Sequence, residues 1–151
     1  MTIAISQFAS RHIDAVLGLQ QQTPEAPRWE RRVYEELAQI GSIGFGLIAE
    51  EGDALLGFAF LRVVLDICEL ESIAVSAVTR RRGIGAMLLT AAANLARERG
   101  ARRMELEVRA GNAAAIGFYI RMGFTQDGLR RGYYSHPEED AVLMSREISP
   151  S

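Results

Sequence analysis

The sequence is poor in cysteine, and this excludes a fold that is held together by disulfide bonds. Cys68 is the only cysteine among 151 residues, so no disulfide can form within one chain. A single free thiol fits a reducing compartment, and we expect a cytoplasmic protein. The N-terminus also lacks the basic start and long apolar core of a secretory signal peptide.

Long apolar runs and an excess of basic charge are missing as well. No apolar stretch approaches the roughly 20 residues that span a bilayer, so we expect no membrane association. The formal net charge of −2 argues against a general nucleic-acid-binding protein. The only two histidines, His12 and His136, have no metal-ligand spacing with each other, and we expect no metal site.

The apolar content is nevertheless sufficient for a folded core. Hydrophobic residues make up 48% of the chain and charged residues 24%, which is typical of a globular protein rather than a disordered one. A chain of this length predicts a single domain over residues 1–151. Such a domain buries roughly 70% of the surface that its unfolded chain exposes.

Hydrophobic periodicity predicts a mixture of strands and helices along the whole chain. Strands are expected at residues 3–5, 47–49, 55–64, 67–75, 103–109, 124–132 and 141–147. Helices are expected after Ser10, near residues 29–39, after Gly83 and after Asn112.

Turn signals indicate how these strands are arranged. Glu51-Gly52-Asp53 and Asp66 mark tight turns, so the strands around them are expected to form an antiparallel meander. The helical pattern after Gly83 separates the strands at 67–75 and 103–109, which the crossover rule makes parallel. Two irregular segments are also expected, a loosened chain at Gly41, Gly44 and Gly46 and an aromatic and acidic loop at residues 133–140.

Glycines and arginines gather where the strand ending at Val75 leads into the next helix. Glycines let the backbone approach a ligand without Cβ clashes. The first amides of a helix have no intrahelical partner and can point at an anion. Together with the arginine charges, these features predict a pyrophosphate-binding turn. The residues concerned are Arg80, Arg81, Arg82, Gly83, Ile84, Gly85 and Ala86.

The spacing of this turn excludes two other phosphate-binding motifs. The Gly-x4-Gly-Lys-Ser/Thr run of a P-loop is missing, and Leu88 stands where a Rossmann fingerprint needs its third glycine or alanine. The remaining pattern, Arg80-x-x-Gly83-x-Gly85, resembles the acetyl-CoA signature of the GNAT superfamily of N-acetyltransferases. The alternative interpretation is a glycine-containing helix start with a solvated basic turn.

Three segments carry the resemblance further. They are Ile73-Ala74-Val75, Leu106-Glu107-Val108-Arg109 with Asn112-Ala113-Ala114-Ala115-Ile116 and Tyr119, and Arg130-Arg131-Gly132-Tyr133-Tyr134 with Glu139-Asp140-Ala141. Their combination resembles the branch of the superfamily that acetylates the N-terminal alanine of a small-subunit ribosomal protein. The resemblance implies an α+β (α/β three-layer) GNAT fold. Its sheet would be mixed and mostly antiparallel, with a central parallel pair splayed at the acetyl-CoA site and helices on both faces.

The resemblance also implies how acetyl-CoA would be held. Backbone groups of Ile73, Ala74 and Val75 would pair with the pantetheine amides as a neighbouring strand does. The Val75 amide would donate to the thioester oxygen. Asn112, whose position alone predicts a helix cap, would also offer its side-chain amide to the pantetheine arm.

Glu107 is the candidate general base, acting directly or through a water. It lies on the strand face opposite Leu106 and Val108, near the strand-to-helix junction. The alternative interpretation is a solvent-facing strand glutamate, and the resemblance favours the base. Glu69 and Glu71 on the parallel neighbour are the reserve candidates.

Tyr119 is the candidate general acid, because a phenol can protonate a thiolate as it leaves. Aromatic residues at helical spacing are usually core residues, as we expect of Phe118, and the resemblance favours a catalytic role for Tyr119. Cys68 is expected to be a buried structural cysteine rather than an acyl-carrying nucleophile.

These residues favour an acetyl-CoA-dependent enzyme that acetylates the N-terminal α-amine of a protein, with a ribosomal protein as the implied partner. A small-molecule amine acetyltransferase and a non-catalytic acetyl-CoA-binding regulatory module stay open as alternatives. Nucleic-acid binding through two short arginine clusters is least favoured. Near the entrance for the acceptor we expect Tyr133 and Tyr134 to grip a peptide, and the acidic run at residues 138–140 to attract a basic one.

Overall fold

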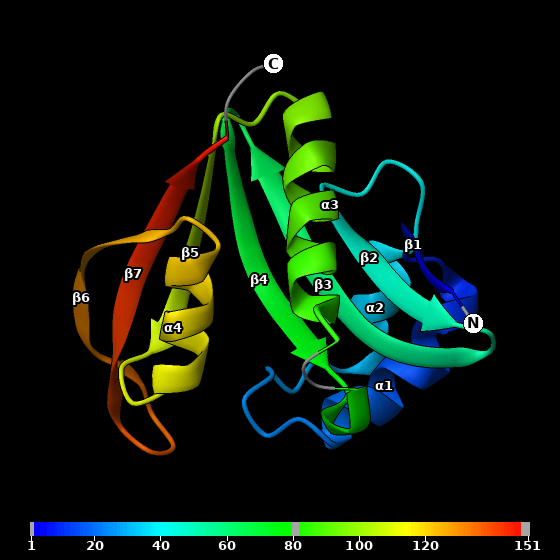
Figure 1. Ribbon diagram of the computed structural model, residues 1–151, viewed down its shortest axis with the longest axis horizontal. Coiled ribbons are helices and arrows are strands. Elements are labelled where there is room, and N and C mark those ends of the chain that lie inside the picture. The colour runs from blue at the N-terminus through cyan, green and yellow to red at the C-terminus, as the bar shows by residue number, and fades with distance from the viewer. Residues whose placement is uncertain (1, 80–81, 149–151) are drawn as a thin grey trace.

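The computed structural model describes residues 2–79 and 82–148, so Arg80 and Arg81 lie outside the described part of the chain. Within this part, seven strands form one mixed sheet in the order β1-β2-β3-β4-β5-β7-β6 (Figure 1). The strands are β1 (Ile3–Gln7), β2 (Gly44–Glu51), β3 (Ala54–Val64), β4 (Ile67–Val75), β5 (Arg103–Arg109), β6 (Thr125–Tyr134) and β7 (Glu139–Glu147).

Helices cover both faces of this sheet. Helices α3 (Ile84–Glu98) and α4 (Ala113–Arg121) lie on one face, and α1 (Ile13–Gln21) and α2 (Arg31–Leu37) lie on the other (Figure 1). Short 3-10 turns at Ser10–His12 and Ala77–Thr79 precede α1 and α3. The predicted three-layer arrangement is therefore confirmed. In these described ranges, no helix has the length and apolar character that crossing a bilayer would require.

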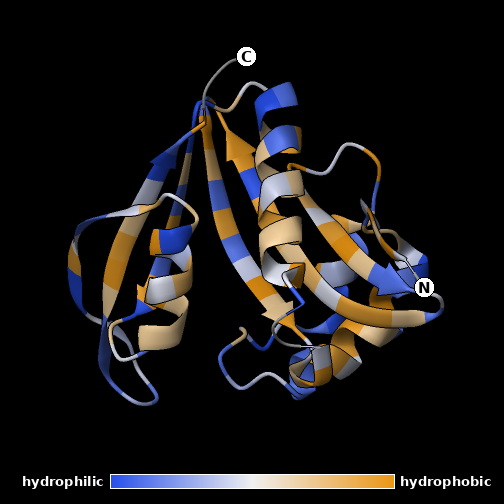
Figure 2. Cartoon of the chain, viewed as in Figure 1, coloured by the Kyte–Doolittle hydropathy of each residue, from blue (hydrophilic) through white to orange (hydrophobic). Residues whose placement is uncertain are grey.

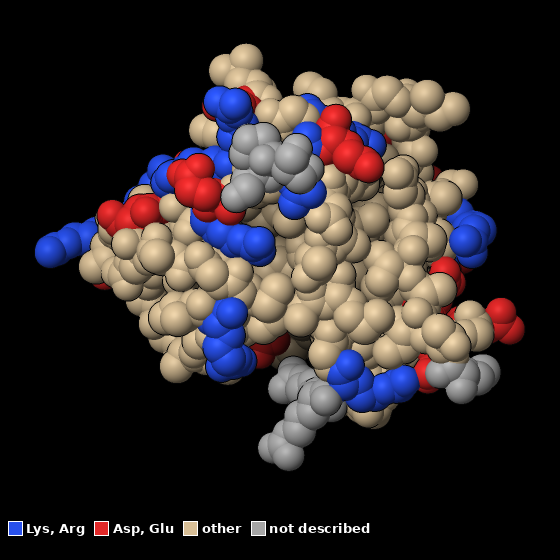
Figure 3. Space-filling model, turned by 45° about the horizontal axis from the view of Figure 1, so that its top comes forward, with Lys and Arg blue, Asp and Glu red and all other residues tan. Residues whose placement is uncertain are grey.

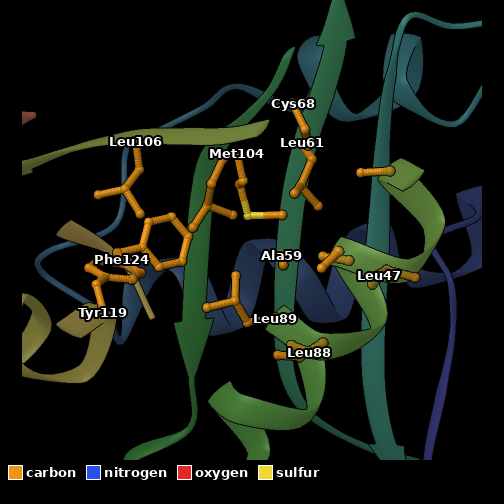
Figure 4. Packing of buried hydrophobic residues seen from close by; sticks show 14 of the residues in the cluster. Leu47, Ala59, Leu61, Cys68, Leu88, Leu89, Met104, Leu106, Tyr119 and Phe124 are labelled. Atoms are coloured by element: carbon orange, nitrogen blue, oxygen red, sulfur yellow. The ribbon is translucent and has the colours of Figure 1, made fainter. Parts of the chain in front are cut away.

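Two hydrophobic clusters fill the spaces between the layers. The larger one joins α3 and α4 to the sheet, and Leu88 and Leu89 of α3 face the strands that carry Ala59, Leu61 and Met104 (Figure 4). The smaller one joins α1 and α2 to the opposite face through aromatic rings such as Phe60. The central strands accordingly carry many hydrophobic residues, whereas the last turn of α3 is hydrophilic (Figure 2). Both helix layers are thus packed against the sheet through hydrophobic side chains.

The parallel pair β4 and β5 opens partway along its length. In the described residues, β4 pairs with β5 only at residues 67–69 and 103–105. Beyond that point β4 follows its antiparallel neighbour β3, whereas β5 follows β7. The two strands diverge toward their carboxyl ends, as Figure 1 shows. The predicted splay is confirmed, and its opening lies where both strands lead into helices.

The predicted strands at 67–75 and 103–109 are confirmed at both ends, but the prediction was wrong at two irregular segments. Gly44 and Gly46 belong to β2 rather than to a loosened chain. A Cβ at Gly46 would lie 2.5 Å from Cε1 of Phe60, so the glycine there makes room for a buried ring. The loop expected at 133–140 is shorter, since β6 extends to Tyr134 and β7 begins at Glu139.

Candidate active site

One edge of β4 faces the opening with its backbone groups. On the other edge the Ser76 amide donates to the Leu56 carbonyl at 2.7 Å, and Ala74 is paired with Phe58 of β3. Because backbone groups point alternately to the two sides of a strand, Ala74 directs its groups to β3. Ile73 and Val75 direct theirs into the opening. Of the three predicted backbone contacts to pantetheine, those of Ile73 and Val75 therefore fit the geometry and that of Ala74 does not.

The two glycines of the β4–α3 turn are needed for different physical reasons. Gly83 is the N-cap of α3 and has φ +76°, a left-handed conformation that favours glycine. Gly85 lies in the first turn of α3, where a Cβ would lie 3.3 Å from Cζ of Phe118 on α4. Gly83 brings no side chain to cap the helix, so the first amides of α3 keep their capacity to bind an anion.

Arg82, which is predicted to contact the phosphates, forms an ion pair in the structure. Its guanidinium donates to both carboxylate oxygens of Glu51, at the end of β2, with distances of 3.1 and 2.7 Å. This hydrogen bonding lowers the pKa of Glu51 and raises that of Arg82. A contact of Arg82 with a pyrophosphate would require the pair to open. The predicted contacts of Arg80 and Arg81 fall outside the described residues.

Glu107 lies on β5 beside the opening, on the face opposite α3 and α4. Its side chain is 33% exposed, and Nη1 of Arg130 from β6 approaches its Oε1 at 3.6 Å. A hydrogen bond to this carboxylate raises the pKa of Tyr133. The Arg130 guanidinium also lies over the Tyr133 ring, 5.0 Å from its centroid. Arg130 and Tyr133 thus lie next to the carboxylate, and the strand pattern around Glu107 did not reveal these neighbours.

Tyr119 projects from α4 into the end of the larger core and is 6% exposed (Figure 4). Phe118 and Phe124 pack against it with ring centroids 5.3 and 5.6 Å away. Burial raises the pKa of Tyr119 to about 12, with a further contribution from Tyr134. Tyr119 is therefore a core residue, as in the alternative interpretation. Its hydroxyl nevertheless stays protonated and can donate at neutral pH.

Tyr134 was not assigned to the catalytic pair, but it interacts electrostatically with both of its members. Desolvation and then the charge of Glu107 raise the pKa of Tyr134, and Tyr134 in turn affects Tyr119. The ring of Tyr134 lies next to Arg109 at the end of β5 and next to Tyr133. Its place at the end of β6 became clear only from the strand pairing of Tyr134 with Glu139.

The reserve carboxylates on β4 have different surroundings. Glu69 forms an ion pair with Arg62 on β3 at 3.2 Å. Glu71 occupies the irregular position in the β3–β4 pairing, and desolvation raises its pKa. Neither has the combination of an arginine and a tyrosine that surrounds Glu107, so Glu107 keeps its place as first candidate.

Asn112 and Cys68 occupy the structural positions that the sequence predicts for them. Oδ1 of Asn112 accepts from the Ala115 amide at 3.2 Å and caps α4, which leaves the NH₂ group as the part that can reach a ligand. Cys68 is fully buried in the larger core, and burial raises its pKa to about 12, which confirms a structural cysteine. Across residues 2–79 and 82–148, no three potential metal ligands gather in one place.

Charges of both signs are mixed on one face of the molecule. On the face shown in Figure 3, arginines and acidic residues lie next to one another. Ion pairs such as Arg62–Glu69 and Arg103–Glu105 are examples of this pairing. This face therefore offers little basic surface to a nucleic-acid backbone.

Comparisons with known proteins agree on one family. The model of the acetyltransferase (GNAT) family matches residues 13–124. Over 96% of its length the chain is 35% identical to the ribosomal protein bS18-alanine N-acetyltransferase of Salmonella typhimurium, of which the match covers 97%. The crystal structure of the ribosomal-protein-S18-alanine N-acetyltransferase from Escherichia coli aligns with a TM-score of 0.85 and 31% identity, covering 99% of this chain and 96% of that one. Arabidopsis thaliana NAA60, solved in complex with acetyl-CoA, shares the fold, with a TM-score of 0.87 at 19% identity over 97% and 99% of the two chains.

Proposed function

Because the chain belongs to the acetyltransferase (GNAT) family, we propose that it transfers the acetyl group of acetyl-CoA to the α-amine of a protein N-terminus. The end-to-end similarity to acetyltransferases named for ribosomal protein bS18 and alanine carries this assignment. The acceptor we infer is accordingly a ribosomal protein whose chain begins with alanine. The chain is an enzyme by its family, so a purely regulatory module is not pursued further.

Acetyl-CoA, which supplies the activated acetyl thioester, is assigned to the opening between β4 and β5. The amide-bearing pantetheine arm suits the free strand edge at Ile73 and Val75. The pyrophosphate suits the uncapped N-terminus of α3, where the amides of Ile84, Gly85 and Ala86 can bind an anion. Arg80 and Arg81 stay in this assignment because of the family signature, and Asn112 can bind the arm through its NH₂ group.

Three residues around the opening divide the catalytic tasks. Glu107 takes the proton of the attacking amine, directly or through a water, while Arg130 and Tyr133 hold its carboxylate. The Val75 amide stabilises the negative charge that develops on the acetyl oxygen. Tyr119, whose pKa is about 12, stays protonated at neutral pH and donates to the leaving thiolate.

The acceptor chain is assigned to the sheet face that carries Glu107. Tyr133 and Tyr134 at the end of β6 border this face and offer aromatic surface to the first residues of a peptide. Next to them, a hollow of about 450 Å³ lies along the hairpin and gives the following residues room. It is lined by Gly132, Tyr134, Ser135, His136, Pro137 and Glu138.

Labelled acetyl-CoA and a mixture of ribosomal proteins test this assignment together. We expect mass spectrometry to find the label on the α-amine of a protein that begins with alanine. The enzyme itself contains no lysine, so self-labelling at a lysine side chain cannot contribute background. Label confined to lysine side chains, or to a small amine added in competition, would contradict the assignment.

A further inference from the structure

The end of β5 and the β6–β7 hairpin are joined by a compact network of hydrogen bonds. Arg109, the last residue of β5, donates from Nη1 to Oε1 of Glu139 at 3.2 Å and to the Pro137 carbonyl at 3.1 Å. The other carboxylate oxygen of Glu139 accepts from the Gly111 amide at 2.6 Å. Arg109 and Glu139 thus connect the segment that leads into α4 with both sides of the hairpin turn.

Arg109 also contacts the face of an aromatic ring at the end of β6. Its Cζ atom lies 4.3 Å from the ring centroid of Tyr134, a distance at which a guanidinium and a ring attract each other. Tyr133 packs edge-on against the same ring, with centroids 5.0 Å apart and an angle of 81°. Tyr134 is therefore held by an arginine and by a neighbouring aromatic ring.

The acidic residues of the hairpin are engaged in holding it together. Both carboxylate oxygens of Glu139 have partners, and Oδ1 of Asp140 accepts from the Gly132 amide at 2.9 Å. Glu139 and Asp140 thus stabilise the hairpin as well, and the attraction of a basic acceptor by the run at 138–140 stays a prediction.

We propose that Arg109 is a positioning residue for the acceptor. Through Glu139 it fixes the hairpin, and through its guanidinium face it holds Tyr134 where the first residue of an incoming peptide passes toward Glu107. Arg109 acts through Tyr134 and does not touch the reacting atoms. This rests on the proposed function, because it concerns how the same site receives its peptide.

Steady-state kinetics of Arg109→Gln and Arg109→Lys with an alanine-initiated peptide test this role. For Arg109→Gln we expect the peptide KM to rise about tenfold, the size of a partly desolvated cation–aromatic contact. The kcat should change little, and the Kd of acetyl-CoA should stay the same. Arg109→Lys keeps the charge but loses the planar guanidinium, so its peptide KM should lie between that of the wild type and that of Arg109→Gln.

A double-mutant cycle separates this positioning from a general loss of structure. In a Tyr134→Ala background, Arg109→Gln should raise the peptide KM no further, because the ring that it holds is gone. Additive effects of the two substitutions on KM would overturn the proposal. A fall in kcat at unchanged KM would overturn it as well, because Arg109 would then act on the chemical step.

Arg103→Gln is the matched control. Arg103 lies at the other end of β5, is 36% exposed against 34% for Arg109, and forms ion pairs with Glu105, Asp127 and Glu147. This control should leave the peptide KM unchanged. If Arg109→Gln does not fold, Glu139→Gln weakens the same anchor and should raise the peptide KM.

The two levels of inference fail in different ways. If the wild-type enzyme acetylates no peptide α-amine, the proposed function is wrong. If it acetylates the peptide and the KM of folded Arg109 and Glu139 variants equals that of the wild type, only the positioning role is wrong.

Discussion

Glu107 and Tyr119 have opposite surroundings, which suit opposite roles in proton transfer. Glu107 is partly exposed and lies next to Arg130 and Tyr133, so its carboxylate is oriented yet accessible to an amine. Tyr119 is almost fully buried, and burial raises its pKa to about 12. A base that can reach solvent and an acid that keeps its proton are what amine acetylation requires.

Glu107→Gln removes the basic carboxylate with little change of shape. We expect kcat to fall by roughly 10²–10⁴, the usual contribution of a general base, while acetyl-CoA still binds with wild-type affinity. Stopped assays at neutral pH measure kcat, and calorimetric titration measures the affinity for acetyl-CoA. Normal turnover of the variant would move the base to Glu69 or Glu71.

Tyr119→Phe keeps the ring in the core and removes the acidic proton. We expect transfer to slow by about 10²-fold with little change in the melting temperature. Since the raised pKa keeps the wild-type hydroxyl protonated until the pH approaches about 12, Tyr119 should cause no loss of kcat between pH 7 and 10. If the kcat of the wild type falls between pH 7 and 10 and this fall is absent in Tyr119→Phe, Tyr119 ionises in that range, which would contradict its raised pKa.

At the scale of elements, the site exists because β4 and β5 separate after three paired residues. The separation frees one edge of β4 for a ligand, and the α3 and α4 helices flank it. The close approach of these two helices depends on Gly85, whose missing side chain leaves room for Phe118.

Gly85→Ala tests whether this approach matters for the cofactor. The added Cβ would lie 3.3 Å from Cζ of Phe118, so the ring and the first turn of α3 must move apart by a few tenths of an ångström. We expect the affinity for CoA to fall about tenfold while the protein stays folded. Gly18→Ala on α1 is the control, because a Cβ there meets nothing within 4 Å. If folded Gly85→Ala binds CoA with the affinity of the wild type, the assignment of the pyrophosphate to this turn is wrong.

The elements next to the site were the easiest to predict from sequence. Strict alternation along residues 103–109 and the helical period after Gly83 reflect burial against one face, which is a local property. Gly46 misled the prediction, because glycine commonly loosens a chain and the ring of Phe60 that requires it lies on another strand. The ion pair of Arg82 with Glu51 and that of Arg109 with Glu139 join residues about 30 positions apart, which no local pattern reports.

At the scale of the whole molecule, the opening between β4 and β5 can be reached from both faces of the sheet. The face with α3 and α4 carries the N-terminus of α3 and the buried Tyr119, and the opposite face carries Glu107. In the proposed function, acetyl-CoA and acceptor meet across the gap between β4 and β5, and the amine attacks directly without an acyl-enzyme intermediate. The buried thiol of Cys68 fits such direct transfer, because its pKa of about 12 makes it a poor nucleophile.

A competition assay tests the central claim most directly. The enzyme receives equal amounts of a basic peptide that begins with alanine, the same peptide with a blocked α-amine and an added lysine, and a polyamine, together with labelled acetyl-CoA. We predict that the free α-amine of the alanine peptide takes up nearly all of the label. Preferential labelling of the lysine side chain or of the polyamine would contradict the account and leave an acetyltransferase of a different acceptor.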